Sequence, residues 1–432
     1  MKLKLLSLLL PLCLWQSSLQ AEDLVQVYRL AVENDAQLRA ARATRDAVLE
    51  IKPQAKALLL PYAALDGSLS RVDVDSDGTT DGSFTGSDLS LSLVQSVYNR
   101  ADWLQLEQAD AGIAQAQAQY ETAEQALILR VAQAYFDVLS ALDSLEFVQS
   151  ENAAIARQLD QAKQRFEVGL IAITDVHEAQ AAYDQSRADL IKAENDVDNA
   201  WEALNEIINA PVSALDRVTE EIPLDPPSPA DIEQWNEAAQ QQNLAIQAAR
   251  YGAEVAKQNI EIERSGHYPT LDLIGGYGLD RTDSDSGFDS DTASIGLQLD
   301  VPIYSGGATT SRTRQAGYEY EAAQESLDQQ RRATSRQVRD AYRAVVASIS
   351  AVHALKASTV SAQSALEATE AGFEVGTRTM VDVLNAQRDA FRAKSNYAQI
   401  RYLYILSGLD LKQASGALSP NDLEQVNSLL RK

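Results

Sequence analysis

Two long stretches of this 432-residue chain carry the same spacing of apolar and small residues, about 207 positions apart. Within each stretch the positions follow one another in steps of four and three residues, and a step of three is repeated at the same place in both. Alternating steps of three and four are the period of a coiled coil, and the repeated step is a local phase slip that changes the supercoiling. The spacing therefore predicts two equivalent coiled-coil helices. Their matched positions are Val131, Tyr135, Val138, Leu142, Leu145, Val148, Asn152, Ile155, Leu159, Ala162 and Phe166, and Val338, Tyr342, Val345, Ile349, Val352, Leu355, Thr359, Ala362, Leu366, Thr369 and Phe373.

Both helices are predicted to be very long. From about Ala101 to Glu167 the only helix-weakening residue is Gly112, and alanine, glutamine, glutamate and leucine dominate. At 1.5 Å per residue a helix over this range is ~100 Å long. The second helix, from about Arg312 to Glu374, is nearly as long. Such helices cannot form the core of an ordinary globular domain, so they must pack lengthwise on each other or on further copies of the chain.

The chain contains an internal duplication. The segment Phe166-Glu167-Val168-Gly169 recurs as Phe373-Glu374-Val375-Gly376. Five of the eleven prolines lie between the halves, which is typical of a linker. The predicted division is a first repeat over residues 22–210, a proline-rich linker over 211–230, a second repeat over 231–407 and a C-terminal segment over 408–432.

Each half also contains a hairpin of strands before its long helix. Alternating side chains predict a strand with one oily face, because successive side chains of a strand point to opposite faces. Partner strands are expected near 62–71 and 270–281, joined by polar tips at 73–87 and 283–292. Tyrosines mark the ends away from the tips, where an aromatic girdle would lie. The alternating apolar residues are Leu89, Leu91 and Leu93, and Ile295, Leu297, Leu299, Val301 and Ile303; the tyrosines are Tyr62, Tyr98, Tyr268 and Tyr304.

Four strands of this length can each cross a bilayer, but they cannot close a barrel alone. Bacterial membrane barrels begin at about 8 strands. Two chains would give eight strands, whose lumen side chains tend to fill, whereas three chains would give twelve and leave room for a pore. The strand pattern therefore predicts an oligomer, and a pore favours a trimer.

The first 21 residues have the layout of a signal peptide. Lys2 and Lys4 precede an apolar run, and the small residue Ala21 ends the segment, so we expect the mature chain to start at Glu22. Cleavage would remove Cys13, the only cysteine. No disulfide, thiol chemistry or acyl anchor is expected.

The formal net charge is −25, and it becomes about −27 without Lys2 and Lys4. This acidic excess argues against a nucleic-acid partner and favours attraction of cations. No apolar stretch of about 18 residues follows the signal region, so no transmembrane helix is expected, although membrane-spanning strands would leave a much weaker pattern.

Three segments lie at the ends of the predicted coiled coils: residues 166–176 (FEVGLIAITDV), 376–384 (GTRTMVDVL) and 302–307 (PIYSGG). In these segments the chain resembles the TolC family of outer-membrane efflux proteins, and the resemblance covers nearly all of the chain. The resemblance implies an α+β membrane protein that forms a trimer. Four strands per chain would build a twelve-stranded outer-membrane β-barrel, continued by a twelve-helix periplasmic α-barrel of coiled coils. The linker and the C-terminal segment would form an equatorial region.

The implied function is the channel of a tripartite efflux or type I secretion system, located in the cell outer membrane and extending into the periplasm. Drugs, small molecules or proteins would leave an inner-membrane RND or ABC transporter through a gated trimeric tunnel. A periplasmic adaptor (membrane fusion) protein and outer-membrane lipid are the further partners implied.

The resemblance also assigns roles to residues at the predicted helix turns. Thr174, Asp175 and Arg378 would hold the tunnel closed, and Asp382 would form an acidic ring in the trimer. The family often has a tyrosine at the position of Phe373 and a second acid at Asn385, so this gate is a variant. Glu178, the equivalent of Asn385 in the first half, would restore the charge.

Other assignments concern docking and chain direction. Val168-Gly169-Leu170 and Val375-Gly376-Thr377 match the segments where the adaptor docks in this family, whereas Pro61 and Pro269 match its helix-to-strand turns. A proline there cannot continue a helix.

Simpler interpretations stand beside these roles. Asp175 and Asp382 could be N-caps of the returning helices, and Arg378 could be a solvated charge. Gly169 and Gly376 could serve only the tight turns.

Other function classes find less support. The three histidines share no ligand spacing, and neither a phosphate-binding loop nor a nucleophile elbow is present, so we expect no enzyme, cofactor or metal site. Asp73 to Asp81 resembles the start of a calcium loop, but Phe84 occupies the place of the bidentate glutamate, which favours a merely acidic loop. A periplasmic coiled-coil scaffold or adaptor without a pore, and a passive porin, are the alternatives to a channel.

Overall fold

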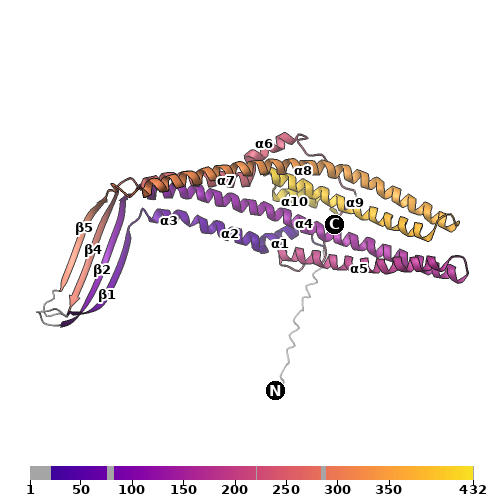
Figure 1. Cartoon of the computed structure of the whole chain (residues 1–432), viewed down its shortest axis with the longest axis horizontal. Helices are drawn as coiled ribbons and strands as arrows, with labels where there is room; N and C mark the ends of the chain where they lie inside the picture. Colours follow the sequence, from indigo (N-terminus) through magenta and orange to yellow (C-terminus); the bar gives the residue numbers. More distant parts are fainter. Residues whose placement is uncertain (1–20, 75–81, 220, 284–288, 432) are drawn as a thin grey trace, which may run out of the picture.

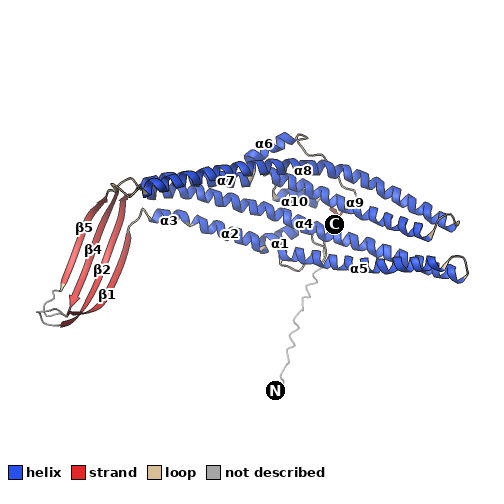
Figure 2. Ribbon diagram, viewed as in Figure 1, coloured by secondary structure: helices blue, strands red, loops and turns tan. Residues whose placement is uncertain are grey.

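The computed structural model describes residues 21–74, 82–219, 221–283 and 289–431. The molecule is elongated, with a small sheet at one end and helices along the rest of its length (Figures 1 and 2). Nearly all of the predicted signal peptide, Cys13 and most of the predicted calcium-loop residues lie outside the described residues.

Four long helices form two antiparallel hairpins that lie side by side (Figure 1). The first hairpin packs α4 along α5, the second packs α8 along α9, and α4 also contacts α9. The two predicted long helices are confirmed, with starts one and four residues earlier than expected. The bounds are α4 Arg100–Glu167, α5 Ile173–Ile208, α8 Ala308–Glu374 and α9 Met380–Ser415.

The predicted seams are the packed faces of α4 and α8. In α8 every seam position is buried or half-buried, and in α4 only Phe166 is exposed, at 42%. The 3/4 spacing therefore identified the coiled-coil faces correctly in both repeats. Phe166 is exposed because it belongs to the last turn of α4, beyond which the chain reverses.

Shorter helices pack along the long helices between the sheet and the middle of the molecule (Figure 1). In the first repeat α2 and α3 run along α4, and in the second repeat α7 lies between α4 and α8. The bounds are α1 Leu24–Asn34, α2 Ala36–Leu49, α3 Ile51–Ala57, α6 Ile232–Gln242, α7 Leu244–Ser265 and α10 Pro420–Asn427.

The segment between the repeats meets the end of the chain. The strand β3 (Arg217–Val218) pairs antiparallel with β6 (Leu430–Arg431), and Glu22 bridges to Leu215. The boundary placed after residue 407 falls inside α9, which continues to Ser415.

The sheet consists of four antiparallel strands in the order β1-β2-β4-β5, so its two repeats join through β2 and β4. The expectation that Val301 and Ile303 belong to the last strand is wrong, because that strand ends at Asp300. Pro302, which has no N–H to donate to a ladder, explains the early end. The strands are also longer at the tip side than expected. The bounds are β1 Tyr62–Val74, β2 Gly82–Tyr98, β4 Thr270–Thr282 and β5 Ser290–Asp300.

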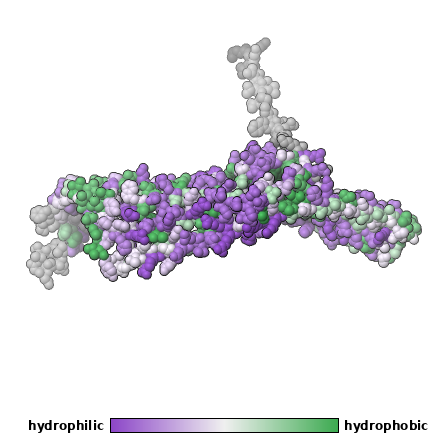
Figure 3. All heavy atoms as spheres, turned by 90° about the horizontal axis from the view of Figure 1, so that it is seen from above, coloured by the Kyte–Doolittle hydropathy of each residue, from purple (hydrophilic) through white to green (hydrophobic). Residues whose placement is uncertain are grey.

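One face of the sheet is apolar across all four strands. The register places Leu65 opposite Leu91 and Leu91 opposite Tyr277, and it pairs Leu273 with Leu297. Many of these side chains are exposed in the single chain, Leu65 and Leu297 each at 67%. On the face seen in Figure 3, hydrophobic residues gather at the sheet end and at the opposite tip, with smaller patches between them on a mostly hydrophilic surface. An exposed apolar face of this extent requires an apolar environment.

The main core lies midway along the molecule, where α1, α4, α5 and α9 meet. The Tyr135 hydroxyl donates to the backbone oxygens of Glu22 (3.2 Å) and Asp216 (2.8 Å), and the Tyr402 hydroxyl donates to Asp143 (2.5 Å). Burial is the first cause of a raised pKa in both tyrosines, so both stay protonated donors. The Tyr402 bond joins the two hairpins, since Tyr402 belongs to α9 and Asp143 to α4, whereas the Tyr135 bonds hold the start of the described chain and the linker against α4.

A buried aspartate connects the start of α2 to α4. Asp35 is 3% exposed, caps α2 by accepting from the Leu38 N–H, and accepts two hydrogen bonds from Arg130 at 2.9 and 3.1 Å. We expect Asp35→Asn to lower the free energy of unfolding by about 1–3 kcal/mol, because asparagine keeps the cap but loses the charged pair with the partly exposed arginine. Urea unfolding of the detergent-solubilised protein measures the loss. Asp46→Asn, at an exposed pair with Arg45, is the matched control, and an equal loss there would contradict the role of burial.

The prediction that the chain has no transmembrane helix is not tested by helix length and composition alone, and it stays a prediction. Within the described residues, α8 contains an 18-residue window of mean hydropathy 1.3, which is long and apolar enough by length and composition alone. A bilayer needs about 20 residues, whereas α8 has 67 and packs its seam along α9.

Candidate functional site at the hairpin ends

Both hairpins reverse direction through the same backbone turn. After α4, Gly169 has φ +77°, its N–H donates to the Phe166 carbonyl (2.9 Å), and the Leu170 N–H donates to the Arg165 carbonyl (2.9 Å). After α8, Gly376 has φ +78° with the equivalent pair of bonds. This is the Schellman arrangement, in which a left-handed residue satisfies the last helical carbonyls. Glycine is required here, because other residues adopt this φ only with strain.

The returning helices begin with capped first turns. Thr379 is the N-cap of α9: its hydroxyl accepts from the Asp382 N–H (3.2 Å), and the Asp382 carboxylate accepts from the Thr379 N–H (2.9 Å) and hydroxyl (2.9 Å). In α5 the Asp175 carboxylate accepts from the Ala172 N–H at 3.3 Å. The interpretation of the two aspartates as N-caps is therefore wrong in position, since both are the third residue of their helices, although both satisfy the cap backbone.

The environment of Asp382 keeps it charged. The Thr379 N–H, then the Thr379 hydroxyl, and to a smaller extent the Arg378 charge hold the pKa of Asp382 below its ordinary value. A lowered pKa stabilises the folded state above the ordinary value, and this contribution is lost as the pH falls through the lowered pKa.

Arg378 lies against its own hairpin. A Cβ added to Gly372 would be 2.8 Å from the Arg378 Cγ and 3.2 Å from the Thr377 Oγ1, so the missing side chain of Gly372 makes room for the arginine stem. Within the described part of the chain, no ion pair joins Arg378 to Asp175. The single chain thus brings Arg378 toward Asp382 and leaves its pairing with Asp175 as a prediction.

The ends of the two hairpins touch through residues that the sequence analysis did not connect. The Arg165 guanidinium of α4 lies 4.8 Å from the centre of the Phe373 ring of α8. Beside them, Met380 of α9 is 1% exposed, in a cluster with Ile155 and Leu159 of α4. The only signal that could have found this contact was the presence of one methionine, other than Met1, at a helix start.

The remaining predicted site residues lie at the surface of this tip. Thr174, Glu178 and Asn385 are exposed in the single chain. The predicted docking residues are exposed as well, Val168 at 70%, Leu170 at 73% and Val375 at 75%, and Gly169, Gly376 and Thr377 lie beside them.

The two prolines lie at the opposite end of the helices. Pro61 separates α3 from β1, and Pro269 separates α7 from β4, each directly before the first residue of the strand. Both helices end in equivalent hydrogen-bonded turns, with Leu60 N–H donating to Ala57 and Tyr268 N–H to Ser265.

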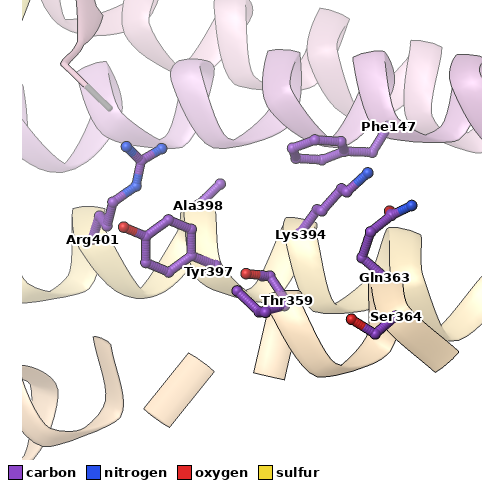
Figure 4. A pocket seen from close by; sticks show the side chains of 9 residues that line it. Phe147, Thr359, Gln363, Ser364, Lys394, Tyr397, Ala398 and Arg401 are labelled. Atoms are coloured by element: carbon purple, nitrogen blue, oxygen red, sulfur yellow. The ribbon is translucent and has the colours of Figure 1, made fainter. Parts of the chain in front are cut away.

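A groove of about 670 Å³ separates the hairpins between the core and the tip (Figure 4). Phe147 of α4 lines one side, while Thr359 of α8 and Lys394, Tyr397 and Arg401 of α9 line the other. The hairpins therefore contact each other on both sides of the groove. On the core side the contact is between Tyr402 and Asp143, and on the tip side it is the cluster of Met380 with Ile155 and Leu159. In the residues described, no three possible metal ligands gather.

Comparison with known proteins agrees with this arrangement. The family described as "Outer membrane efflux protein" matches residues 27–210 and 235–417. The outer membrane protein TolC of Vibrio cholerae is 43% identical over 420 residues, which are 96% of this chain and 95% of TolC. The proteases secretion protein PrtF of Dickeya chrysanthemi is 28% identical and aligns over 99% of this chain and 95% of its own.

Among solved structures, the CmeC outer membrane channel of Campylobacter jejuni superposes with a TM-score of 0.78 at 18% identity. The alignment covers 96% of this chain and 92% of CmeC. At this identity the likeness concerns the fold alone.

Proposed function

The chain belongs to the outer membrane efflux protein family and is an outer-membrane channel for efflux and type I secretion; we propose that three copies form its pore and that the hairpin ends are its gate. The proposed activity is passage, with no covalent bond made or broken. The cargo would be drugs, other small molecules or proteins.

The four-stranded sheet is the observation that most strongly supports the proposed trimer. Its outer strands β1 and β5 leave unpaired edges, and one of its faces is apolar and exposed. Open strand edges do not occur in the hydrocarbon of a membrane, so the sheet must close. Pairing β5 of one copy with β1 of the next would close a barrel of twelve strands around a pore.

The helices would continue this pore. Four long helices per chain would give a twelve-helix barrel in the periplasm, with the segment around β3 and β6 forming an equatorial belt. At 1.5 Å per residue the 68 residues of α4 span ~100 Å.

The gate would be the ring of six hairpin ends. Arg378 would pair with Thr174 and Asp175 of a neighbouring hairpin, and Asp382 would line an acidic ring together with Glu178 and Asn385. Each exposed ion pair contributes only ~0.2–1 kcal/mol, so the ring can open and close. The exposed tip residues Val168 and Val375, with their flanking residues, would bind a periplasmic adaptor that is coupled to an inner-membrane RND or ABC transporter.

Arg378→Ala is expected to raise the single-channel conductance of the purified protein in a planar bilayer, because it removes a contact of the closed ring. Gly372→Ala should raise the conductance in the same direction while retaining the charge, since its methyl group displaces the arginine stem. Gly317→Ala is the matched control, because a Cβ there meets nothing within 4 Å in the same helix.

Unchanged conductance in Arg378→Ala would remove this arginine from the gate but leave the pore. Absence of any channel from folded wild-type protein would instead favour the scaffold function and overturn the proposal.

A further inference from the structure

An arginine-rich face runs along α8, opposite the buried seam of that helix and beside α6. Its residues recur at steps of four, three and four, so they share one side of the helix. Three of them are 70–81% exposed, and the fourth, Arg339, pairs with Glu233 of α6 at 3.1 Å. We call this the arginine face; it consists of Arg332, Arg336, Arg339 and Arg343.

The four arginines of the arginine face outnumber the carboxylates that pair with them within the chain. Arg332 pairs with Asp328 on the preceding turn at 2.6 Å, but Arg336 and Arg343 share the single Asp340 at 4.0 and 3.8 Å. Exposed pairs of this kind contribute little. In a chain of net charge −25, a concentrated positive strip is therefore suited to a negatively charged partner surface.

An acidic face of matching spacing runs along α5. Asp198, Glu202 and Glu206 follow one another at steps of four, are all exposed, and lie opposite the buried Val197 and Leu204. Within the described ranges they form no ion pair with another residue of the chain.

The two faces lie at opposite edges of the molecule. In Figure 1, α8 lies along one edge, with α6 outside it over part of its length, and α5 lies along the other edge, with α9 and α4 between them. The edge strands of the sheet lie on the same two sides. The strand β5 leads into α8, and β1 follows α3, which lies on the α5 side. Joining β5 to β1 of the next copy therefore also brings α8 toward α5 of that copy.

The two faces also lie at the same height along the molecule. The Asn152 side chain donates to the Ser186 hydroxyl (2.8 Å), which fixes the register of α4 against α5. Counting sixteen residues away from the tip on both helices places Phe136 beside Glu202. Phe136 is the equivalent of Arg343 in the duplicated chain, so Arg343 lies level with Glu202 and, by the same count, Arg339 with Glu206.

We propose that the arginine face of one copy binds the acidic face of α5 in the next copy, with Arg343 against Glu202. The partner is a second copy of this chain, repeated three times around the ring. This inference rests on the proposed trimer and identifies a surface that holds it together between the membrane and the tip. A head-to-tail contact of this kind closes a ring when the same joint repeats.

Disulfide trapping tests the contact. Arg343→Cys and Glu202→Cys are combined in a Cys13→Ser background, which has no other cysteine. Oxidation should convert most of this protein into linked dimers and trimers on a non-reducing denaturing gel. The control combines Arg343→Cys with Asp184→Cys, on the same outer face of α5 but ~27 Å nearer the tip, and it should stay unlinked.

Native mass spectrometry of the same samples separates the outcomes. Trimers that remain unlinked in the Arg343 and Glu202 pair would overturn this surface and leave the channel intact. Monomers alone would overturn the proposed trimer and this surface with it. As a second measurement, Arg343→Glu should lower the trimer fraction on dilution, and adding Glu202→Arg should restore it; no restoration would contradict the pairing.

Discussion

Met380→Ala should produce channels with a conductance several times that of the wild type. Met380 is 1% exposed and fills the cluster that joins α9 to Ile155 and Leu159 of α4. Shortening a buried methionine to alanine costs about 2–5 kcal/mol in a packed core. Because 1.4 kcal/mol changes an equilibrium about tenfold, the closed tip should lose most of its population if opening separates these helices. Planar-bilayer recording of the purified variant measures the effect.

Val381→Ala is the matched control, since Val381 is the next residue of α9 and is 38% exposed. Its conductance should stay near that of the wild type. Equal conductance in wild type and Met380→Ala, with unchanged helical circular dichroism, would contradict a closing role for the cluster.

The tip shows where sequence reasoning reaches its limit. The turns at Gly169 and Gly376 were predictable, because they depend on bonds between residues close in sequence. For the same reason it was predictable that the two aspartates bond to the starts of their helices, although their position as N-caps was wrong. The contact of Arg165 with Phe373 joins residues more than 200 positions apart, and no periodicity within one helix reveals such a neighbour. Gly372 was missed for a related reason, since the space it provides for Arg378 exists only after the chain has turned back.

The fold was easier to predict from the sequence, because the chain contains two regular spacings of apolar residues, one typical of helices and one typical of strands. The 3/4 seam and the alternating leucines gave the helices and strands, and the duplication gave their pairing into equivalent hairpins. The strand ends were less accurate: Val301 and Ile303 continued the alternation, but Pro302 between them ended the ladder. The buried Asp35 carried no sequence signal that distinguished it from exposed acids, since its partner Arg130 lies 95 residues away.

Gly416→Ala should cause the largest loss of stability among single substitutions that remove no side-chain atom. Gly416 ends α9 with φ +83°, and an added Cβ would be 2.6 Å from the Gln242 oxygen and 2.8 Å from the Asn243 nitrogen. A left-handed L-residue costs about 1–2 kcal/mol and overpacking about 1–3 kcal/mol, so we expect a loss of about 2–5 kcal/mol. The displaced segments also carry the bond from Asn243 to Ala414 (3.0 Å). Urea unfolding in detergent measures the change.

Two further variants separate the causes of this loss. Gly408→Ala lies in the same helix with nothing within 4 Å of the added Cβ, so it should be neutral or stabilise by up to about 1 kcal/mol. Gly416→Asn keeps a residue that tolerates the left-handed conformation, as Asn209 does at the equivalent end of α5 with φ 43°. If close approach to Gln242 dominates, Gly416→Asn should lose nearly as much stability as Gly416→Ala. Wild-type stability in Gly416→Asn would instead mean that the backbone conformation alone requires glycine, and that the junction of α6, α7 and α9 can shift to admit a side chain.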